Sequence, residues 1–204
     1  IIEGWLMARR REFDVDEALD AVLCVFWRKG YEGASYTDLT KAAGVERPAL
    51  YSAFGNKEAL FRKALARYYE RYLDFFPAAL EKPTSREVAA HILFSAAELH
   101  PRYPDNPGCL GIHGVLAGTD ESEPVRRALI EARAGGEASL RERFERAKEE
   151  GDLPKSVDCA GLAAFVMAVS HGMAVQAKAG FKRETLEAVA EQALSTWPGR
   201  GAAA

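Results

Sequence analysis

The stretch between Ser35 and Leu60 contains a surface whose residue types suit contact with the edges of DNA bases. Two short helices are expected to meet at a tight turn around Gly44, because glycine adopts a left-handed conformation at little cost. The side chains that would hold the pair together are Leu39, Val45, Leu50 and Phe54. The outer face of the second helix would then carry Arg47, Pro48, Ala49, Tyr51 and Ser52. Such a helix fits the major groove with its first residues against base edges, which predicts a helix-turn-helix unit.

Cysteine and histidine give no comparable signal for catalysis. The four histidines (His91, His100, His113 and His171) lack the close spacing of metal ligands. The three cysteines (Cys24, Cys109 and Cys159) lie far apart, and their odd number predicts free thiols in a reducing cytosol. No nucleophile elbow, phosphate-binding lysine loop or dinucleotide fingerprint is present. The sequence therefore predicts no cofactor, no metal and no enzyme.

The composition narrows how the chain could bind DNA. It has 204 residues, a formal net charge of −3, 48% hydrophobic residues and 28% charged residues. A chain with this balance is not a uniformly basic nucleic-acid coat, so any DNA binding must come from local placement of charge. We find no secretory signal and no run long enough to cross a membrane, which predicts a soluble cytoplasmic protein. Residues 1–6, ahead of Met7, are expected to be foreign to the native chain, and residues 199–204 to form a flexible tail.

The hydrophobic periodicity is helical throughout, so we expect an all-α fold. Asp14 with Glu17 predicts the start of the first helix and Gly30 its end. Ser35 with Asp38 begins a second, and Asn56 caps a long helix that Pro77 would end near residue 76. Ser85 is expected to cap a further helix, which would stop before the proline-rich turn at Pro101. The remaining helices are expected near residues 46–54, 110–117, 123–150, 158–179 and 183–196.

The helix-turn-helix stretch resembles the DNA-binding domain of the TetR family of regulators. The residues that carry the resemblance are Gly30, Tyr31, Ser35, Ala42, Ala43, Gly44, Val45, Leu50, Tyr51, Phe54, Lys57, Glu58 and Leu60. The region after Pro107 resembles the family's ligand-binding and dimerising domain more weakly. The resemblance implies a DNA-binding domain at 7–56, a long connecting helix, and a helical ligand-binding and dimerisation domain at 57–198.

Several roles follow from this resemblance, position by position. Tyr51 would touch a phosphate or a thymine methyl group, while Lys57 and Thr37 would contact phosphates. Arg47 is the best candidate for reading a base, because a guanidinium can bond a guanine edge through two hydrogen bonds. Glu46 departs from the family pattern, and its carboxylate could either repel phosphate or accept from a cytosine amino group.

A basic arm precedes the first helix. Arg9, Arg10 and Arg11 suit phosphates or a neighbouring minor groove, and a solvated tail explains them equally well.

The second domain is expected to bind a small molecule. The candidate pocket residues combine apolar bulk with a few polar tips, as ligand sites do, although each alone would suit a core. These residues are Phe94, Tyr103, Cys109, Ile112, His113, Met167 and His171. Cys109 could sense oxidants or electrophiles, but a buried structural thiol is the better reading. Glycines at 108, 111, 114 and 118 predict either a soft helix that moves on ligand binding or close helix packing.

The last two helices are expected to form a four-helix dimer interface, as in the family resembled. The candidate residues are Leu162, Phe165, Val169, Met173, Leu186, Val189 and Ala193. A dimer places two reading heads ~34–36 Å or somewhat more apart, which implies a pseudo-palindromic operator in double-stranded DNA.

The resulting hypothesis is a homodimeric transcriptional repressor released from its operator by an unknown effector. One alternative is a thiol-based sensor that uses Cys109. Another, of a different class, is a ligand-binding protein or enzyme with a degenerate helix-turn-helix.

Overall fold

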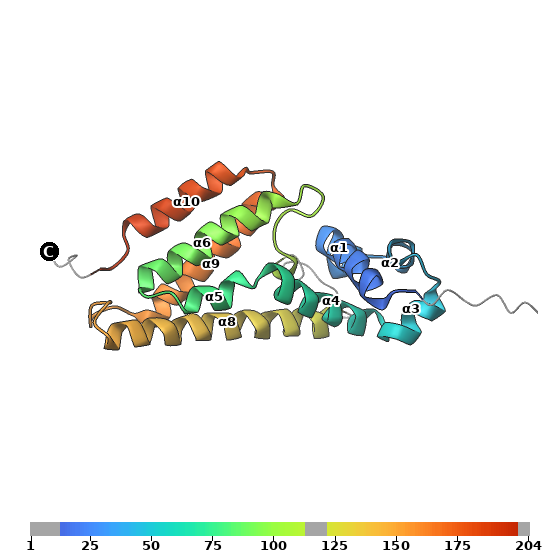
Figure 1. Ribbon diagram of the computed structural model, residues 1–204, viewed down its shortest axis with the longest axis horizontal. Coiled ribbons are helices and arrows are strands. Elements are labelled where there is room, and N and C mark those ends of the chain that lie inside the picture. Colours follow the sequence, from blue (N-terminus) through green and yellow to red (C-terminus); the bar gives the residue numbers. More distant parts are fainter. Residues whose placement is uncertain (1–12, 113–121, 200–204) are drawn as a thin grey trace, which may run out of the picture.

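The computed structural model describes residues 13–112 and 122–199, and within these ranges every regular element is a helix (Figure 1). The helices are α1 (Val15–Gly33), α2 (Tyr36–Ala43), α3 (Arg47–Phe54), α4 (Lys57–Tyr72), α5 (Phe75–Leu80), α6 (Ser85–Arg102), α8 (Glu123–Glu149), α9 (Cys159–Lys178) and α10 (Arg183–Ser195). Helices α1–α3 form a small unit at one end, and α4 leads from it into a larger helical bundle. The predicted all-α fold with a connecting helix is confirmed.

Local capping chemistry explains where the first helices begin and end. The Asp14 carboxylate accepts hydrogen bonds from the amides of Asp16 (2.8 Å) and Glu17 (3.1 Å). Ser35 and Asp38 form a reciprocal capping box at the start of α2. Gly44 ends α2 with φ +66°, a left-handed conformation that a side chain would strain. These signals lie within a few residues of the ends that they control, so the sequence predicts them well.

Two prolines and one cap behave differently from the expectation. The long helix ends at Tyr72, and Pro77 lies inside the short helix α5 instead of terminating α4. Thr84, not Ser85, is the N-cap of α6, because its side chain forms the capping box with Glu87. Helix α6 also passes through Pro101 and ends one residue later. Pro77 lies in the first turn of α5, where amides have no partner within the helix. Pro101 lies one residue before the end of α6, so it removes a hydrogen bond only from the last turn of that helix.

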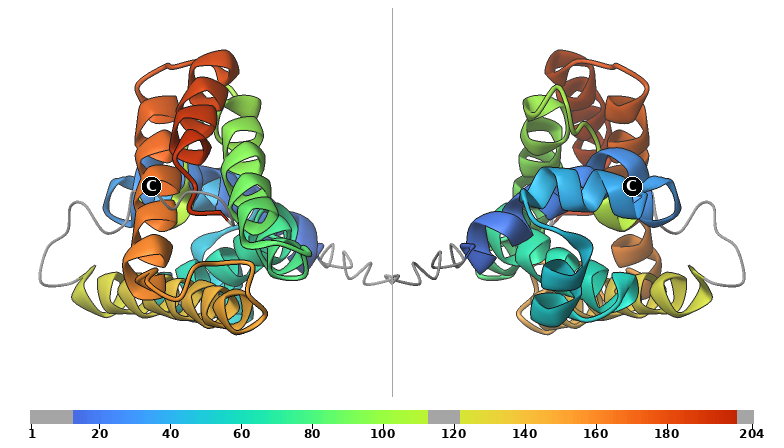
Figure 2. Two further views of the ribbon diagram at one scale, coloured as in Figure 1. Left: turned by 90° about the vertical axis from the view of Figure 1, so that its left-hand side faces the viewer. Right: turned by 90° about the vertical axis from the view of Figure 1, so that its right-hand side faces the viewer.

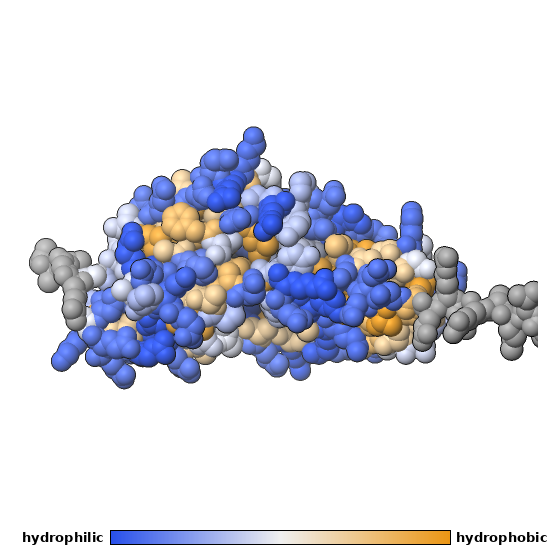
Figure 3. Space-filling model, viewed as in Figure 1, coloured by the Kyte–Doolittle hydropathy of each residue, from blue (hydrophilic) through white to orange (hydrophobic). Residues whose placement is uncertain are grey.

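Helix α8 forms the base of the larger bundle, α6 and α9 stand against it, and α10 packs on α6 and α9 (Figure 2). The face drawn in Figure 3 is largely hydrophilic along α8, with separate apolar patches above it. Arg143 of α8 is only 5% exposed. Its guanidinium donates to the carbonyls of Leu80 (3.0 Å), Lys82 (2.7 Å) and Pro83 (3.0 Å), so it fastens the end of α5 to α8.

An aromatic cluster joins the small unit to the bundle. The indole of Trp27 in α1 is buried and donates from Nε1 to the carbonyl oxygen of Gly108 at 3.0 Å. Its ring centroid lies 4.8 Å from those of Tyr68 and Tyr72 in α4 and 5.5 Å from that of Tyr103. Edge-to-face contacts of this kind add stability beyond burial alone. The cluster therefore ties α1 to both α4 and the segment that follows α6.

Ion pairs bind α1 to α4 along the surface. The Arg67 guanidinium contacts the carboxylates of Asp16 and Asp20, and Arg71 contacts Asp20 at 2.6 Å. Exposed pairs contribute little one by one, but a shared network fixes the relative orientation of the two helices.

Replacing Trp27 with phenylalanine should lower the free energy of unfolding by about 1–3 kcal/mol, because the buried Gly108 carbonyl would lose its donor. Thermal or urea unfolding measures the change. Trp197→Phe is the matched control, since that indole is only half-buried and its longer hydrogen bond, 3.2 Å to the Ser85 hydroxyl, lies outside the aromatic cluster. An equal loss in both variants would contradict the assignment.

Candidate DNA-contacting surface and effector cavity

Arg47 lies at the exposed start of α3 with its guanidinium held by two tyrosines. The Cζ atom is 4.0 Å from the ring centroid of Tyr36 and 5.3 Å from that of Tyr51. Arg47 Nη2 also donates to the Tyr51 hydroxyl at 3.3 Å. A guanidinium that stacks on one ring keeps several N–H groups for another partner. The arrangement can present those donors to a base edge or a phosphate.

Tyr36 is a site residue that sequence reasoning missed. Its ring lies beneath the Arg47 guanidinium and 5.5 Å from the ring of Tyr51. A hydrogen bond with Tyr51 raises the pKa of the Tyr36 hydroxyl, with burial as the next cause. The sequence signal that could have identified it is its position, since Tyr36 is an aromatic residue directly after the Ser35 cap of α2.

The start of α4 is the second polar part of this surface. Asn56 caps the helix by accepting from the Ala59 amide at 2.8 Å. The Lys57 ammonium lies 4.6 Å from the ring centroid of Tyr31. A cation at a helix N-terminus, beside backbone amides, suits a phosphate.

The other predicted DNA contacts differ in exposure. Thr37, Pro48 and Ser52 are exposed, whereas Ala49 and Tyr51 are half-buried. Glu46 is the N-cap of α3, yet its side chain makes no capping hydrogen bond. The arm of Arg9, Arg10 and Arg11 lies outside the described residues.

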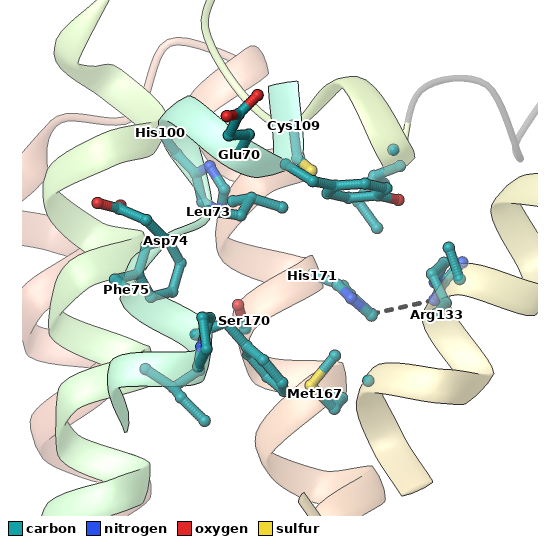
Figure 4. Close-up of a pocket in the computed structure, with 18 residues that line it drawn as sticks. Glu70, Leu73, Asp74, Phe75, His100, Cys109, Arg133, Met167, Ser170 and His171 are labelled. Carbon is teal, nitrogen blue, oxygen red and sulfur yellow. Dashed lines mark hydrogen bonds between the residues drawn. The ribbon is translucent and has the colours of Figure 1, made fainter. Parts of the chain in front are cut away.

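A cavity of about 500 Å³ lies within the larger bundle, between α4, α5, α6, α8, α9 and the segment that contains Cys109 (Figure 4). Of the predicted pocket residues, Cys109, Ile112, Met167 and His171 line it. The lining residues that sequence reasoning missed include Tyr69, Phe75, Phe76, Arg133 and Ser170.

Two predicted pocket residues lie elsewhere, which corrects the expectation. Phe94 is 37% exposed on α6 and does not line the cavity. Tyr103 packs in the aromatic cluster against Trp27 and Tyr72. His113 lies outside the described residues.

One wall of the cavity carries a pair of polar side chains. Arg133 of α8 and His171 of α9 approach to 3.0 Å between Nη2 and Nδ1. Burial, together with the Arg133 charge, lowers the pKa of His171 to about 4, so the imidazole is neutral at physiological pH. Burial likewise raises the pKa of Tyr69 to about 12. The described residues contain no cluster of three or more potential metal ligands.

Cys109 contributes a thiol to the same cavity. Burial is the main influence on it and raises its pKa, while the Tyr68 hydroxyl and the Gly111 and Ile112 amides act in the opposite direction. Because the thiolate is the reactive form, this environment disfavours nucleophilic attack.

Two of the four glycines at positions 108, 111, 114 and 118 lie in the described residues, and only Gly111 is helical. Gly108 has φ +84° and precedes the helical turn that begins at Leu110. At Gly111 a Cβ atom would stand 3.3 Å from the Tyr69 hydroxyl, so at this position close packing explains the glycine. Residues 114 and 118 lie outside the described part of the chain.

The predicted dimer residues divide between the core and the surface. Met173, Leu186 and Ala193 are buried within the chain itself, which corrects their assignment to an outer interface. Leu162 and Val169 are half-buried, while Phe165 (43%) and Val189 (39%) are exposed. The exposed positions of α9 are almost all small or apolar, and they are Ala160, Gly161, Ala164, Phe165, Ala168, Gly172, Val175, Gln176 and Lys178. By length and composition α9 could also cross a membrane, and it is the one helix of the described residues that could.

Comparison with known proteins matches both parts of the chain. The family described as bacterial regulatory proteins of the tetR family matches residues 18–64, and the tetracyclin repressor-like C-terminal domain matches residues 91–193. The transcriptional repressor ComR of Escherichia coli K12 is 31% identical over 192 residues, which cover 93% of this chain and 91% of ComR. The repressor BdcR of the same organism is 28% identical and covers 91% of this chain and 89% of its own.

Solved structures agree with these relatives. A cysteine mutant of the TetR family regulator CifR, complexed with a 26-base-pair double-stranded operator, is 42% identical with a TM-score of 0.88, covering 93% of this chain and 100% of CifR. A TetR regulator from Rhodococcus sp. RHA1 is 40% identical with a TM-score of 0.62, covering 89% and 98%. These relatives are regulators and not enzymes. With its helix-turn-helix unit and its helical second domain, the chain therefore belongs to the TetR family of DNA-binding transcriptional regulators.

Proposed function

We propose that this protein is a homodimeric cytoplasmic repressor that leaves its operator when a small molecule occupies the cavity. In this proposal residues 7–56 read DNA and residues 57–198 bind the effector and the second subunit. The observation that carries it is the physical connection between the two sites. Helix α4 begins at Lys57 on the DNA-contacting surface and contributes Tyr69 and Glu70 to the cavity wall.

A second connection runs through the segment after α6. Cys109 lines the cavity, and the neighbouring carbonyl of Gly108 accepts the hydrogen bond from Trp27 in α1. A ligand that displaces this segment would disturb α1 and the helices packed on it. Allosteric coupling needs such differential contacts between two states of the protein. The buried, protonated thiol of Cys109 favours non-covalent binding over the alternative of thiol sensing.

For DNA, we assign base reading to Arg47 and phosphate contact to Lys57, Thr37 and the Tyr51 hydroxyl. Stacking on Tyr36 supports the role of Arg47, since a guanidinium with restricted motion loses less conformational freedom on binding. Glu46 adds a negative charge next to Arg47, and we assign it to tuning affinity downwards at neighbouring phosphates.

For dimerisation, we assign the exposed face of α9 together with Val189 of α10. Only a third of this apolar helix is buried within the chain. Its small residues allow close approach of a second helix pair, as in four-helix interfaces. A second copy of the chain would cover this face, so no membrane is required to do so.

The DNA roles predict two different effects on binding. With a duplex selected from a random library, Arg47→Ala should cost ~1–3 kcal/mol and relax sequence discrimination, because the bidentate base contact is lost. Lys57→Gln should weaken binding to all duplexes alike and reduce the salt-dependence slope by about 1. Fluorescence anisotropy at several salt concentrations measures both. Lys155→Gln, an exposed lysine in the loop before α9, is the control. Failure to enrich any sequence would reject specific DNA reading.

The interface predicts that Phe165→Glu weakens self-association by about 30-fold or more, since burying an unpaired charge at an interface centre costs ~2 kcal/mol or more. Sedimentation equilibrium measures the dissociation constant. Phe94→Glu replaces a phenylalanine of similar exposure on α6 and should leave the dimer intact. An unchanged dimer in the Phe165 variant would place the interface elsewhere.

The buried imidazole of the cavity predicts a pH-dependent stability. Because the pKa of His171 falls from 6.5 to about 4 on folding, the unfolded chain binds its proton first as the pH drops. Stability should therefore fall between pH 6.5 and 4 and be unaffected by this group above pH 6.5. Urea midpoints across this range should show a shallower slope in His171→Gln. Identical slopes in the two proteins would contradict the assignment.

A further inference from the structure

Arg133 places a positive charge on the wall of the effector cavity. Its guanidinium is half-buried, and its hydrogen-bond partner there is His171 Nδ1 at 3.0 Å. A guanidinium can only donate, so Nδ1 of the imidazole must accept and the ring must be neutral. Within residues 13–112 and 122–199 no carboxylate lies within ion-pair distance of Arg133. The positive charge of Arg133 therefore faces a neutral imidazole and not a carboxylate.

The two acidic residues of the lining do not balance this charge. Glu70 and Asp74 are exposed, and Figure 4 shows their carboxylates directed away from the Arg133–His171 pair. Met167, an uncharged side chain of α9, also lines the cavity and lies on the same side of it in that view. A cation in an apolar enclosure is unfavourable unless an anion or hydrogen-bond acceptors compensate it.

The rest of the lining is apolar and would suit a hydrocarbon or aromatic body. This apolar lining includes Phe75 and Phe76 of α5, Ile92 of α6, Ile112 and Met167. Tyr69 and Ser170 add hydroxyl groups to the lining. The cavity therefore has one cationic wall and one apolar end, which is the complement of an amphiphilic acid.

We propose that the effector is an amphiphilic organic anion, with an acidic group bound by Arg133 and an apolar body against Phe75, Phe76 and Met167. A carboxylate can accept two parallel hydrogen bonds from a guanidinium, which is both strong and directional. The neutral imidazole of His171 accepts one hydrogen bond from the guanidinium and so positions it. Because the imidazole carries no negative charge, it does not compete with an anionic ligand for Arg133. This inference rests on the proposed role of the cavity as the effector site.

Matched series of small molecules test the charge preference on the DNA-free protein. The probes are octanoate, 1-octanol and octylamine, and 3-phenylpropionate with 3-phenylpropanol. Calorimetry and thermal shift should show that at least one acid binds ~10-fold or more tightly than its matched alcohol, and that the amine does not bind. Equal binding of acid and alcohol, or failure of every acid to bind, would overturn the inference.

Variants locate the preference at one side chain. Arg133→Gln should remove the preference for the acid while leaving the alcohol's affinity unchanged, and Arg133→Lys should retain part of it. Arg141→Gln, an exposed arginine on the same helix, should behave as the parent protein. If circular dichroism shows that Arg133→Gln does not fold, Arg133→Lys becomes the test of the inference. Lysine cannot form the bidentate contact, so this variant should still show a reduced preference for the acid over the alcohol. An unchanged preference in the folded variants would overturn the assignment.

A separate measurement keeps this inference distinct from the proposed function. The selected DNA duplex is titrated with each probe and its release is followed by anisotropy. Acids that bind through Arg133 without releasing DNA would refute the effector role and leave the anion site standing. Release by neutral probes, with no acid bound, would support the effector role and refute the anion site.

Discussion

The structure depends on the packing of α4 against α1, because this one helix must serve two surfaces. Its first residue, Lys57, belongs to the DNA-contacting surface, and Tyr69 near its end belongs to the cavity. The sixteen residues of α4 span about 24 Å as a continuous helix. Between the two ends, buried Leu60, Phe61 and Leu65 hold it in the core shared with α1. Close-packed interiors do not deform continuously, so a displacement at one end moves the helix and its partner together.

The first half of the fold could be predicted because its signals are local. Caps at Asp14, Ser35 and Asn56 and the left-handed Gly44 each act within a few residues, and all behave as the sequence indicates. The failures at Pro77 and Pro101 have a different origin. A proline removes one backbone hydrogen bond but does not by itself prevent a helix from forming near it. Near a helix end, tertiary packing decides whether the chain continues as a helix.

The two functional surfaces differ in how far the sequence could define them. The DNA-contacting surface comes mainly from one contiguous stretch, so Arg47, Tyr51 and Lys57 could be identified together. The cavity is assembled from segments far apart in the chain, and its cationic residue lies on the highly charged α8, where Arg133 resembles its solvated neighbours. The apolar candidates had the opposite difficulty, since Phe94 is exposed and Met173 is core although both residue types suit a pocket or an interface. Residue type alone does not determine which side of a helix meets the cavity.

The contact between Trp27 and Gly108 also has an optical consequence. Tryptophan emission responds to the polarity and hydrogen bonding around the indole, and Trp27 is buried among three tyrosines at the junction of the two domains. Trp197 lies at the far end of the bundle beside Phe144, so its surroundings are independent of that junction. The chain therefore carries an intrinsic fluorophore at the point where a signal would have to cross between its domains.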